Sequence, residues 1–390
     1  MPAPGLLAAL GEPLLGYVNG QWTAATGALR NGIAPGTSTD GFLREIGAGY
    51  RAYQQQAAVE PWDDTGHVRC SAPPPTRTAG TPVAEVARAE HPRHGFYGMF
   101  NWGDWNFPGY HDTTKGCEAW GNLEYDTTQV LALAYAATGE PAYHESMVAA
   151  ARHFMDVDRI HYQRARPNWV GMNHPKNPLH CAFELGGVDL GHTWTEGLLS
   201  YYYLTGDDRG RDAARGIADY LVRRSRSAAL RGNPRQWGWP QIALVALYEA
   251  TGDAEYKSAA QVYARGGMAA FPPEKLVGWK MGILADGLSY TDSVARDPLV
   301  RDWLVRYAAA VRAHGSDIDP RFLPAVAYAA RVSTGDPYTA LAAVARLKFG
   351  NWGKPFTIAG RIGFRILSLS AAPAPSSRVT KSAAGHDPPQ

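Results

Sequence analysis

The feature that most constrains the fold is a tripeptide, Thr-Gly followed by Glu or Asp, that ends four apolar helical runs. Its glycine falls at Gly139, Gly206, Gly252 and Gly335. An Ala- and Tyr-rich run such as TQVLALAYAA precedes each tripeptide, and a second helical run such as DAEYKSAAQVYARGG follows. Glycine takes up the left-handed conformation that ends a helix, and an acidic residue stabilises the N-terminus of the next one. The pattern predicts antiparallel helical hairpins.

The spacing of these hairpins favours a closed ring over a linear repeat. The four glycines are 67, 46 and 83 residues apart, which is too irregular for a solenoid of short repeats. The first run of each pair is apolar on all sides, as in a helix packed on both faces. We therefore expect an all-α fold, an α/α toroid of about five or six hairpins with long loops at one rim. The best strand candidate is 358–369, which is also compatible with a helix.

Composition divides the chain into three parts. Residues 1–85 read as a loop-rich N-terminal extension with a helix at 41–58, and residues 86–370 as the toroidal catalytic domain. The last segment, 371–390, is rich in Pro, Ser and Ala, which predicts a disordered tail.

Charge and hydropathy exclude several classes of function. Lys and Arg number 38 against 36 Asp and Glu, so the sequence has no basic footprint for nucleic acid. It contains no apolar stretch long enough to span a membrane, and its first residues lack the basic region of a signal peptide, which favours a cytoplasmic protein. P-loop, dinucleotide-binding and GxSxG motifs are also missing. The 12 Trp and 20 Tyr instead suggest a groove lined with aromatic rings.

Two segments carry aromatic and acidic candidates. Residues 97–112 (YGMFNWGDWNFPGYHD) place Trp102 and Trp105 around Asp104, and their Gly and Pro residues predict a loop. Such a loop suits a sugar-stacking wall, although it could instead bury its rings as a plug. In 117–129, Asp126 is as consistent with a helix cap as with a functional role. Its neighbours Asn122 and Tyr125 are better candidates for contacting substrate.

The strongest segment, 168–207, concentrates imidazoles ahead of an apolar helix. Proton-transfer chemistry suits such a cluster on a rigid frame. Counting along a helix from His192 puts Glu196 at the fourth position, with Tyr202 and Tyr203 at the tenth and eleventh, close to one face. The cluster comprises Asn173, His174, His180 and His192.

A fourth segment, 232–253, places Arg235 ahead of another apolar helix that carries Trp237 and Trp239. If the hairpins run in the same sense, these residues share a rim with the histidines. Arg235 could clamp a carboxylate, or be a surface residue beside core tryptophans. The spacing of His174, His180, Cys181 and His192 lacks the tight pairs of zinc sites, and the three cysteines form no CxxC pair, so we expect no metal or cofactor.

The runs FNWGDW, WGNLEYD, ARHFMDVDRIHY, GHTWTEGLLSYYYLTGD and RQWGWPQIALVALYEATGD, within about 95–290, resemble the central toroid of the YetA-like exo-acting rhamnogalacturonan lyases. The resemblance implies β-elimination on an acidic, rhamnogalacturonan-like saccharide. It assigns Asn173 or Arg235 to neutralise the uronate, His192 or His180 as base, and Tyr202 or Tyr203 as acid. Substrate binding would fall to Trp102, Asp104, Trp105, Asn122, Tyr125, His174, Trp194, Glu196, Trp237 and Trp239.

Two alternatives remain open. A glycoside hydrolase acting on a uronide would need two carboxylates, for which Asp104 with Glu196 or Glu124 with Glu196 are available. A non-catalytic carbohydrate-binding protein would use the same aromatic surface without turnover.

Overall fold

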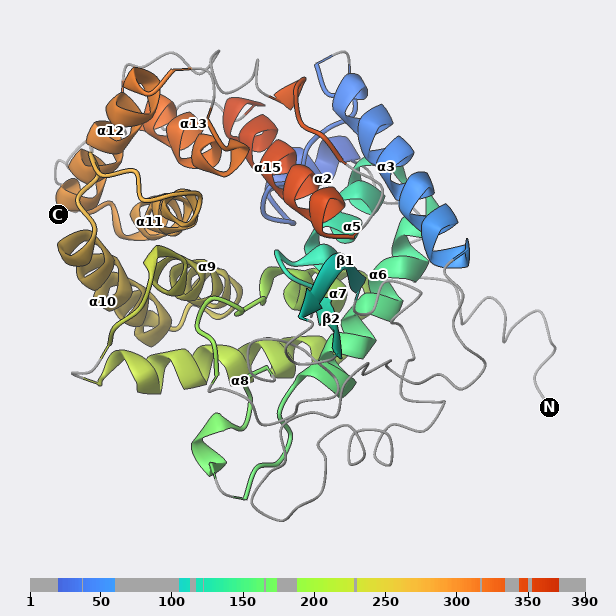
Figure 1. Cartoon of the computed structure of the whole chain (residues 1–390), viewed down its shortest axis with the longest axis horizontal. Coiled ribbons are helices and arrows are strands. Elements are labelled where there is room, and N and C mark those ends of the chain that lie inside the picture. Colours follow the sequence, from blue (N-terminus) through green and yellow to red (C-terminus); the bar gives the residue numbers. More distant parts are fainter. Residues whose placement is uncertain are drawn as a thin grey trace, which may run out of the picture.

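The computed structural model of the chain forms a ring of paired helices, so the α/α toroid is confirmed (Figure 1). None of its helices, within the described ranges, is long and apolar enough to cross a membrane. The structure describes residues 20–36, 38–59, 105–112, 117–121, 123–164, 166–173, 188–227, 230–315, 318–333, 344–349 and 353–371.

An inner ring of helices forms the core. Each inner helix packs against the next, and the last returns to the first, which closes the ring. Nearly every residue of an inner helix is buried, because neighbours cover it on both sides. This explains why the first run of each predicted pair is apolar all round. The inner helices are α5 (Thr127–Thr138), α7 (Glu196–Thr205), α9 (Pro234–Thr251), α11 (Lys280–Ala295), α13 (Leu323–Val332) and α15 (Gly353–Ala371).

Outer helices cover this ring and bury only one face each. In α8, for example, Ala214, Ile217 and Leu221 are buried while the Asp and Arg residues face outward. The outer helices are α3 (Asp40–Val59), α6 (Pro141–His153), α8 (Asp208–Ser225), α10 (Ala254–Ala270) and α12 (Pro298–Ala313). The shorter elements are α2 (Gly20–Thr26), η1 (Phe154–Asp158), η2 (Pro167–Trp169) and η3 (Pro320–Phe322).

The N-terminal region contributes to this architecture. Helix α2 packs against α5, and α3 packs against α15, where the rings of Phe42 and Phe364 meet edge-on at 5.1 Å. The boundary at residue 85 stays a prediction. The proposed tail beyond residue 371 lies outside the described residues.

The glycine turns form as predicted. Gly139, Gly206 and Gly252 have φ of 72°, 73° and 73°, and each backbone N–H bonds to a carbonyl four residues earlier. Asp207 and Asp253 then cap the helices that follow. The turn at 334–336 lies outside the described residues.

One local prediction was wrong. Residues 105–112 are not loop but strand β1 (Trp105–Asp112), which pairs antiparallel with β2 (Cys117–Gly121). Aromatic residues favour strands, and here pairing within a hairpin outweighs the Gly and Pro that suggested a loop. For residues 358–369, the helical alternative is the one observed: the segment lies within α15, where Arg361 and Arg365, four residues apart, share one helical face.

Candidate functional site

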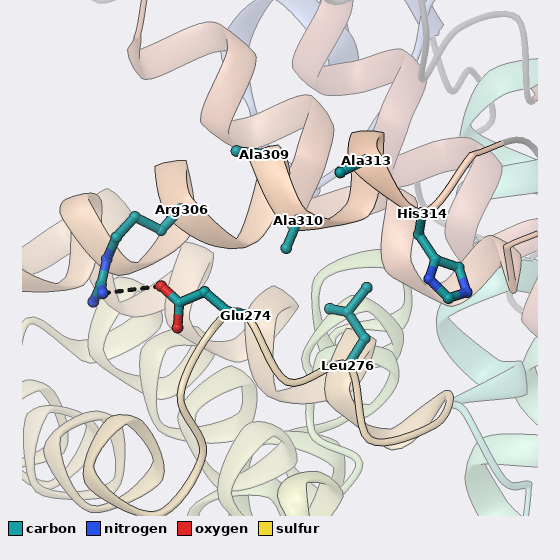
Figure 2. A pocket seen from close by; sticks show the side chains of 7 residues that line it. All are labelled: Glu274, Leu276, Arg306, Ala309, Ala310, Ala313 and His314. Carbon is teal, nitrogen blue, oxygen red and sulfur yellow. Dashed lines mark hydrogen bonds and ion pairs between the residues drawn. The ribbon is translucent and has the colours of Figure 1, made fainter.

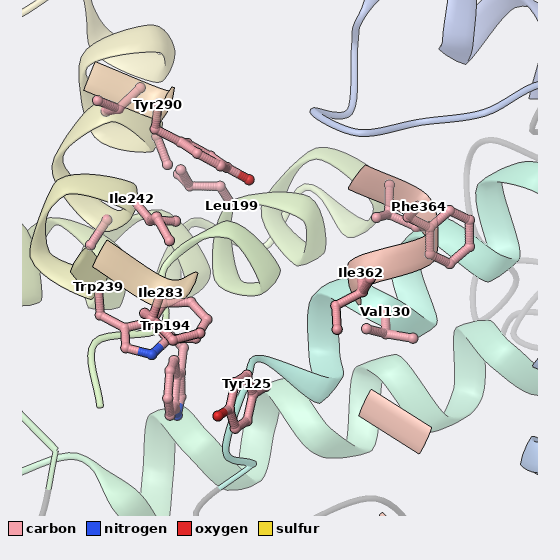
Figure 3. Close-up of a cluster of buried hydrophobic side chains, with 14 of the residues drawn as sticks. Tyr125, Val130, Trp194, Leu199, Trp239, Ile242, Ile283, Tyr290, Ile362 and Phe364 are labelled. Atoms are coloured by element: carbon pink, nitrogen blue, oxygen red, sulfur yellow. The ribbon is translucent and has the colours of Figure 1, made fainter. Parts of the chain in front are cut away.

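The beginnings of the inner helices meet at one rim of the ring and carry an aromatic cluster. The rings of Trp194 and Trp239 meet edge-on at 4.6 Å, and Tyr125 lies 5.8 Å from Trp239 (Figure 3). Trp279, just ahead of α11, lies 6.4 Å from Tyr125. Because the inner helices run in the same sense, residues far apart in sequence share this rim. The structure thus brings together three of the predicted binding residues: Tyr125, Trp194 and Trp239.

The turn that leads into α5 is strained. Leu123, Tyr125 and Asp126 have φ of 53°, 75° and 67°, although none is glycine. Such backbone conformations cost free energy and gather at functional sites. All three residues are buried, as is Glu124 between them. The packing of the ring therefore sustains this strained turn and keeps Glu124, Tyr125 and Asp126 buried.

Three carboxylates lie at this rim, each with its own partners. Glu124 forms an ion pair with Arg235, with Oε1 and Nη2 3.1 Å apart. Glu196, the first residue of α7, accepts a hydrogen bond from the Tyr290 hydroxyl at 2.9 Å and another from Arg361 Nη2 at 2.7 Å. Both Glu196 oxygens therefore accept a hydrogen bond from a buried donor.

The third carboxylate, Asp126, caps α5 by accepting from the Gln129 backbone N–H, as one of the two readings of this residue expects. Its other oxygen accepts from the backbone N–H of Gly197, next to Glu196. Burial raises the pKa of Asp126 to about 6, although the charge of Arg361 opposes this. Asp126 and Glu196 are therefore neighbouring buried carboxyls with different hydrogen-bond donors.

At this rim the buried donors Trp239 Nε1 and Arg361 Nη1 have no hydrogen-bond acceptor among the described residues. The Arg361 guanidinium lies 4.6 Å from the centre of the Trp239 ring. Buried donors usually have partners, so these two atoms suit the oxygen atoms of a bound molecule.

Arg235 and Arg321 reach this rim from α9 and η3. Arg235 donates to the carbonyl of Gly191 at 3.0 Å, which joins it to the 188–195 segment at this rim. Arg321 donates to the Tyr125 hydroxyl at 3.0 Å and pairs with Asp319. Both guanidinium groups are thus already paired with carboxylates.

His192 and Asn173 lie beside this cluster, joined to each other. Asn173 Nδ2 donates to the His192 carbonyl at 2.6 Å, and the His192 ring lies 5.3 Å from that of Trp194. His192 Nε2 is 3.8 Å from a carboxylate oxygen of Asp189. However, α7 begins only at Glu196, so His192 precedes the helix and the helical spacing counted from it was wrong.

Other predicted residues lie apart from this rim. Tyr202 and Tyr203 occupy the last turn of α7, where Tyr202 lies under Arg211 and Tyr203 is 42% exposed. Trp237 points toward the outer ring, where its ring lies 6.3 Å from that of Tyr263 in α10. Trp102, Asp104, Asn122, His174, His180 and the side chain of Trp105 lie outside what the structure describes.

Sequence reasoning missed Trp279, Tyr290, Arg321 and Arg361. The available signal was the pair Arg361 and Arg365 within an otherwise apolar helix, since arginines four residues apart in a core helix require buried partners. The described residues contain no cluster of three or more potential metal ligands.

A surface groove lies elsewhere, between the segment before α11 and helix α12. Leu276, Ala310 and His314 line it, and an ion pair between Arg306 and Glu274 crosses one end (Figure 2). It shares no residue with the aromatic cluster.

Comparison with known proteins changes the functional prediction. Residues 83–272 match the family model of the β-L-arabinofuranosidase GH127 catalytic domain. No curated protein and no solved structure gave a significant match. The matched segment contains the strained turn, α7 and the start of α9.

This match overturns the expectation of a polysaccharide lyase of the YetA-like family acting on rhamnogalacturonan or another uronate polymer. The paired arginines give a physical reason, because Arg235, proposed to neutralise a uronate, is already paired with Glu124. The roles that depended on a lyase reaction no longer apply; these were assigned to Asn173, His192, His180, Tyr202 and Tyr203. The findings favour the hydrolase alternative: over nearly half its length, the chain is similar to the catalytic domain of a glycoside hydrolase.

Proposed function

We propose that the chain is a glycoside hydrolase that cleaves a neutral furanoside of the β-L-arabinofuranoside type. The observation that carries this proposal is the pair of buried carboxyls Asp126 and Glu196, joined through the Gly197 backbone within the matched segment. Glycoside hydrolysis needs one carboxyl that delivers a proton and one that acts as a carboxylate. The different environments of the two carboxyls support a different role for each.

Asp126 is the proposed proton donor, since its pKa of about 6 leaves part of the population protonated near neutral pH. Glu196 is the proposed carboxylate, because Tyr290 and Arg361 donate to both of its oxygens. In this role it either attacks the anomeric carbon or activates a water molecule.

The surrounding residues suit a neutral sugar. Trp194 and Trp239 offer apolar ring surfaces, and Trp239 Nε1 and Arg361 Nη1 offer donors to hydroxyl or ring oxygens. Arg235 and Arg321 already pair with carboxylates, which disfavours a strongly anionic ligand.

The experiment measures nitrophenolate release from p-nitrophenyl β-L-arabinofuranoside. We expect turnover by the wild-type chain, and a loss of roughly 10²–10⁴-fold in kcat for Glu196→Gln and Asp126→Asn. Tyr203→Phe serves as the matched control, since Tyr203 lies in the last turn of the same helix, and should leave kcat unchanged. Turnover that survives Glu196→Gln would refute the assignment. Saccharide binding without turnover would instead indicate a binding protein.

A further inference from the structure

The segment 27–36, between α2 and α3, enters the ring although it lies outside the family match. Leu29, Asn31 and Ile33 are buried in the core, and Gln129 of α5 donates to the Arg30 carbonyl at 3.2 Å. Asn31 has φ of 67°, a conformation that Asn tolerates better than most residues. The segment thus holds one polar side chain deep inside the ring.

Asn31 belongs to a chain of hydrogen bonds that ends at Glu196. Arg365 Nη1 donates to Asn31 Oδ1 at 3.1 Å, and Asn31 Nδ2 donates to the Tyr290 hydroxyl at 2.9 Å. Tyr290 in turn donates to Glu196 Oε1 at 2.9 Å. Asp286 fixes the far end, since it accepts from Arg365 Nε at 3.3 Å.

The direction of every bond in this chain is determined by its first member. A guanidinium can only donate, so the Asn31 atom facing Arg365 must be the amide oxygen. The amide nitrogen therefore faces Tyr290 and donates to it. A hydroxyl has one proton, and because Tyr290 already accepts from Asn31, that proton points to Glu196.

The other charged groups near Glu196 are Arg361 of α15, Asp126 ahead of α5 and, at longer range, Arg30 of the 27–36 segment. The Arg361 charge attracts the Glu196 side chain, whereas an ionised Asp126 repels it. The Tyr290 hydroxyl donates a directed hydrogen bond to Glu196 Oε1, and neither Arg361 nor Arg30 supplies a bond at this atom.

We propose that Asn31 is a positioning residue that directs the Tyr290 hydroxyl proton onto Glu196. In this way a segment outside the matched region maintains a hydrogen bond to the proposed catalytic carboxylate. This inference rests on the proposed function for the role of Glu196, but the hydrogen-bond chain itself does not.

The decisive comparison is Asn31→Asp against Asn31→Gly. In the Asp variant the side chain has a second acceptor and no donor, so Tyr290 can turn its proton away from Glu196. In the Gly variant, which suits the positive φ, Tyr290 loses a donor but keeps Glu196 as its acceptor. A purely structural role predicts that the Gly variant, which removes the whole side chain, is the more perturbed.

Two measurements follow the proton. One is the infrared carboxylate band of Glu196, identified as the band that Glu196→Gln removes; the other is the acidic limb of kcat/KM against pH. We expect Asn31→Asp to displace the band in the same direction as Tyr290→Phe, and to move the acidic limb up by about one pH unit. Asn31→Gly should displace both readouts by less than Asn31→Asp, because Tyr290 loses a donor but keeps Glu196 as its acceptor; Asn31→Asp should add nothing in a Tyr290→Phe background.

Ser293→Ala is the control, because Ser293 accepts from Arg30 Nη2 at 3.0 Å and joins the same segment to the same helix outside the chain of bonds. It should displace neither readout. Equal displacement by the Asp and Gly variants, or a further displacement in the Tyr290→Phe background, would overturn the inference. If the wild-type chain hydrolyses no furanoside, the proposed function fails, and the infrared comparison still decides the role of Asn31.

Discussion

Replacing Asp126 by Asn should remove a specific part of the pH dependence of stability. Burial raises the pKa of Asp126 from 3.8 to about 6. A folded-state pKa above the unfolded value means that the native state binds the proton more tightly. The resulting stabilisation is complete below about pH 4 and is lost as pH rises through 6. The difference of 2.2 pKa units corresponds to about 3 kcal/mol.

Asn is the suitable replacement because it is a good N-cap and tolerates the positive φ at this position. Any cost of placing its amide group against the backbone N–H of Gly197 does not depend on pH. The free energy of unfolding, from urea titrations followed by tryptophan fluorescence, should therefore rise in the variant relative to wild type by roughly 2–2.5 kcal/mol between pH 4 and pH 7, most of the full difference.

A matched control is Asp207→Asn at the cap of α8. There, burial would raise the pKa, but hydrogen bonds from Arg209 and Tyr201 outweigh it and lower the pKa of Asp207 to about 2. The stabilisation from Asp207 is present above the unfolded pKa and lost as pH falls from about 4 to about 2, so the control should show the opposite slope in that range and almost no slope between pH 4 and pH 7. A difference between Asp126→Asn and wild type that stays constant with pH, or falls, would refute the reasoning.

Three further substitutions test the packing of the ring. Gly197→Ala would place its methyl carbon 2.2 Å from Asp126 Oδ1, so we expect a loss of roughly 2–4 kcal/mol by urea denaturation, together with loss of turnover. Arg361→Met leaves Glu196 buried without its cation and should lower the free energy of unfolding by about 3–5 kcal/mol. The loss should be smaller when Glu196→Gln is already present, and additive losses in the double variant would contradict this. Trp237→Ala should cost about 3–5 kcal/mol but leave kcat of the folded fraction unchanged, because this ring faces the outer helices.

Part of the candidate site could be anticipated from the sequence. Five residues of this rim were named as candidates from the sequence: Tyr125, Trp194, Trp239, Glu196 and Arg235. They could be found because aromatic and charged residues near the start of an apolar helix are conspicuous in the sequence. The residues that form hydrogen bonds or ion pairs with them could not be recognised in the sequence. Tyr290 resembles any tyrosine in a core helix until its hydroxyl is seen to reach Glu196, 94 positions away.

The helical hairpins that build the ring could be predicted from the sequence, because the features that determine them are local. A glycine such as Gly206 ends a helix through its own backbone, and helical periodicity depends on neighbours three or four residues apart. Which residues meet inside the ring was decided only by closure, which brings Arg361 to Glu196 across 165 positions and Asn31 to Tyr290 across 259. No local pattern encodes such pairs, because their free energy exists only once the helices are packed and water is excluded from between them.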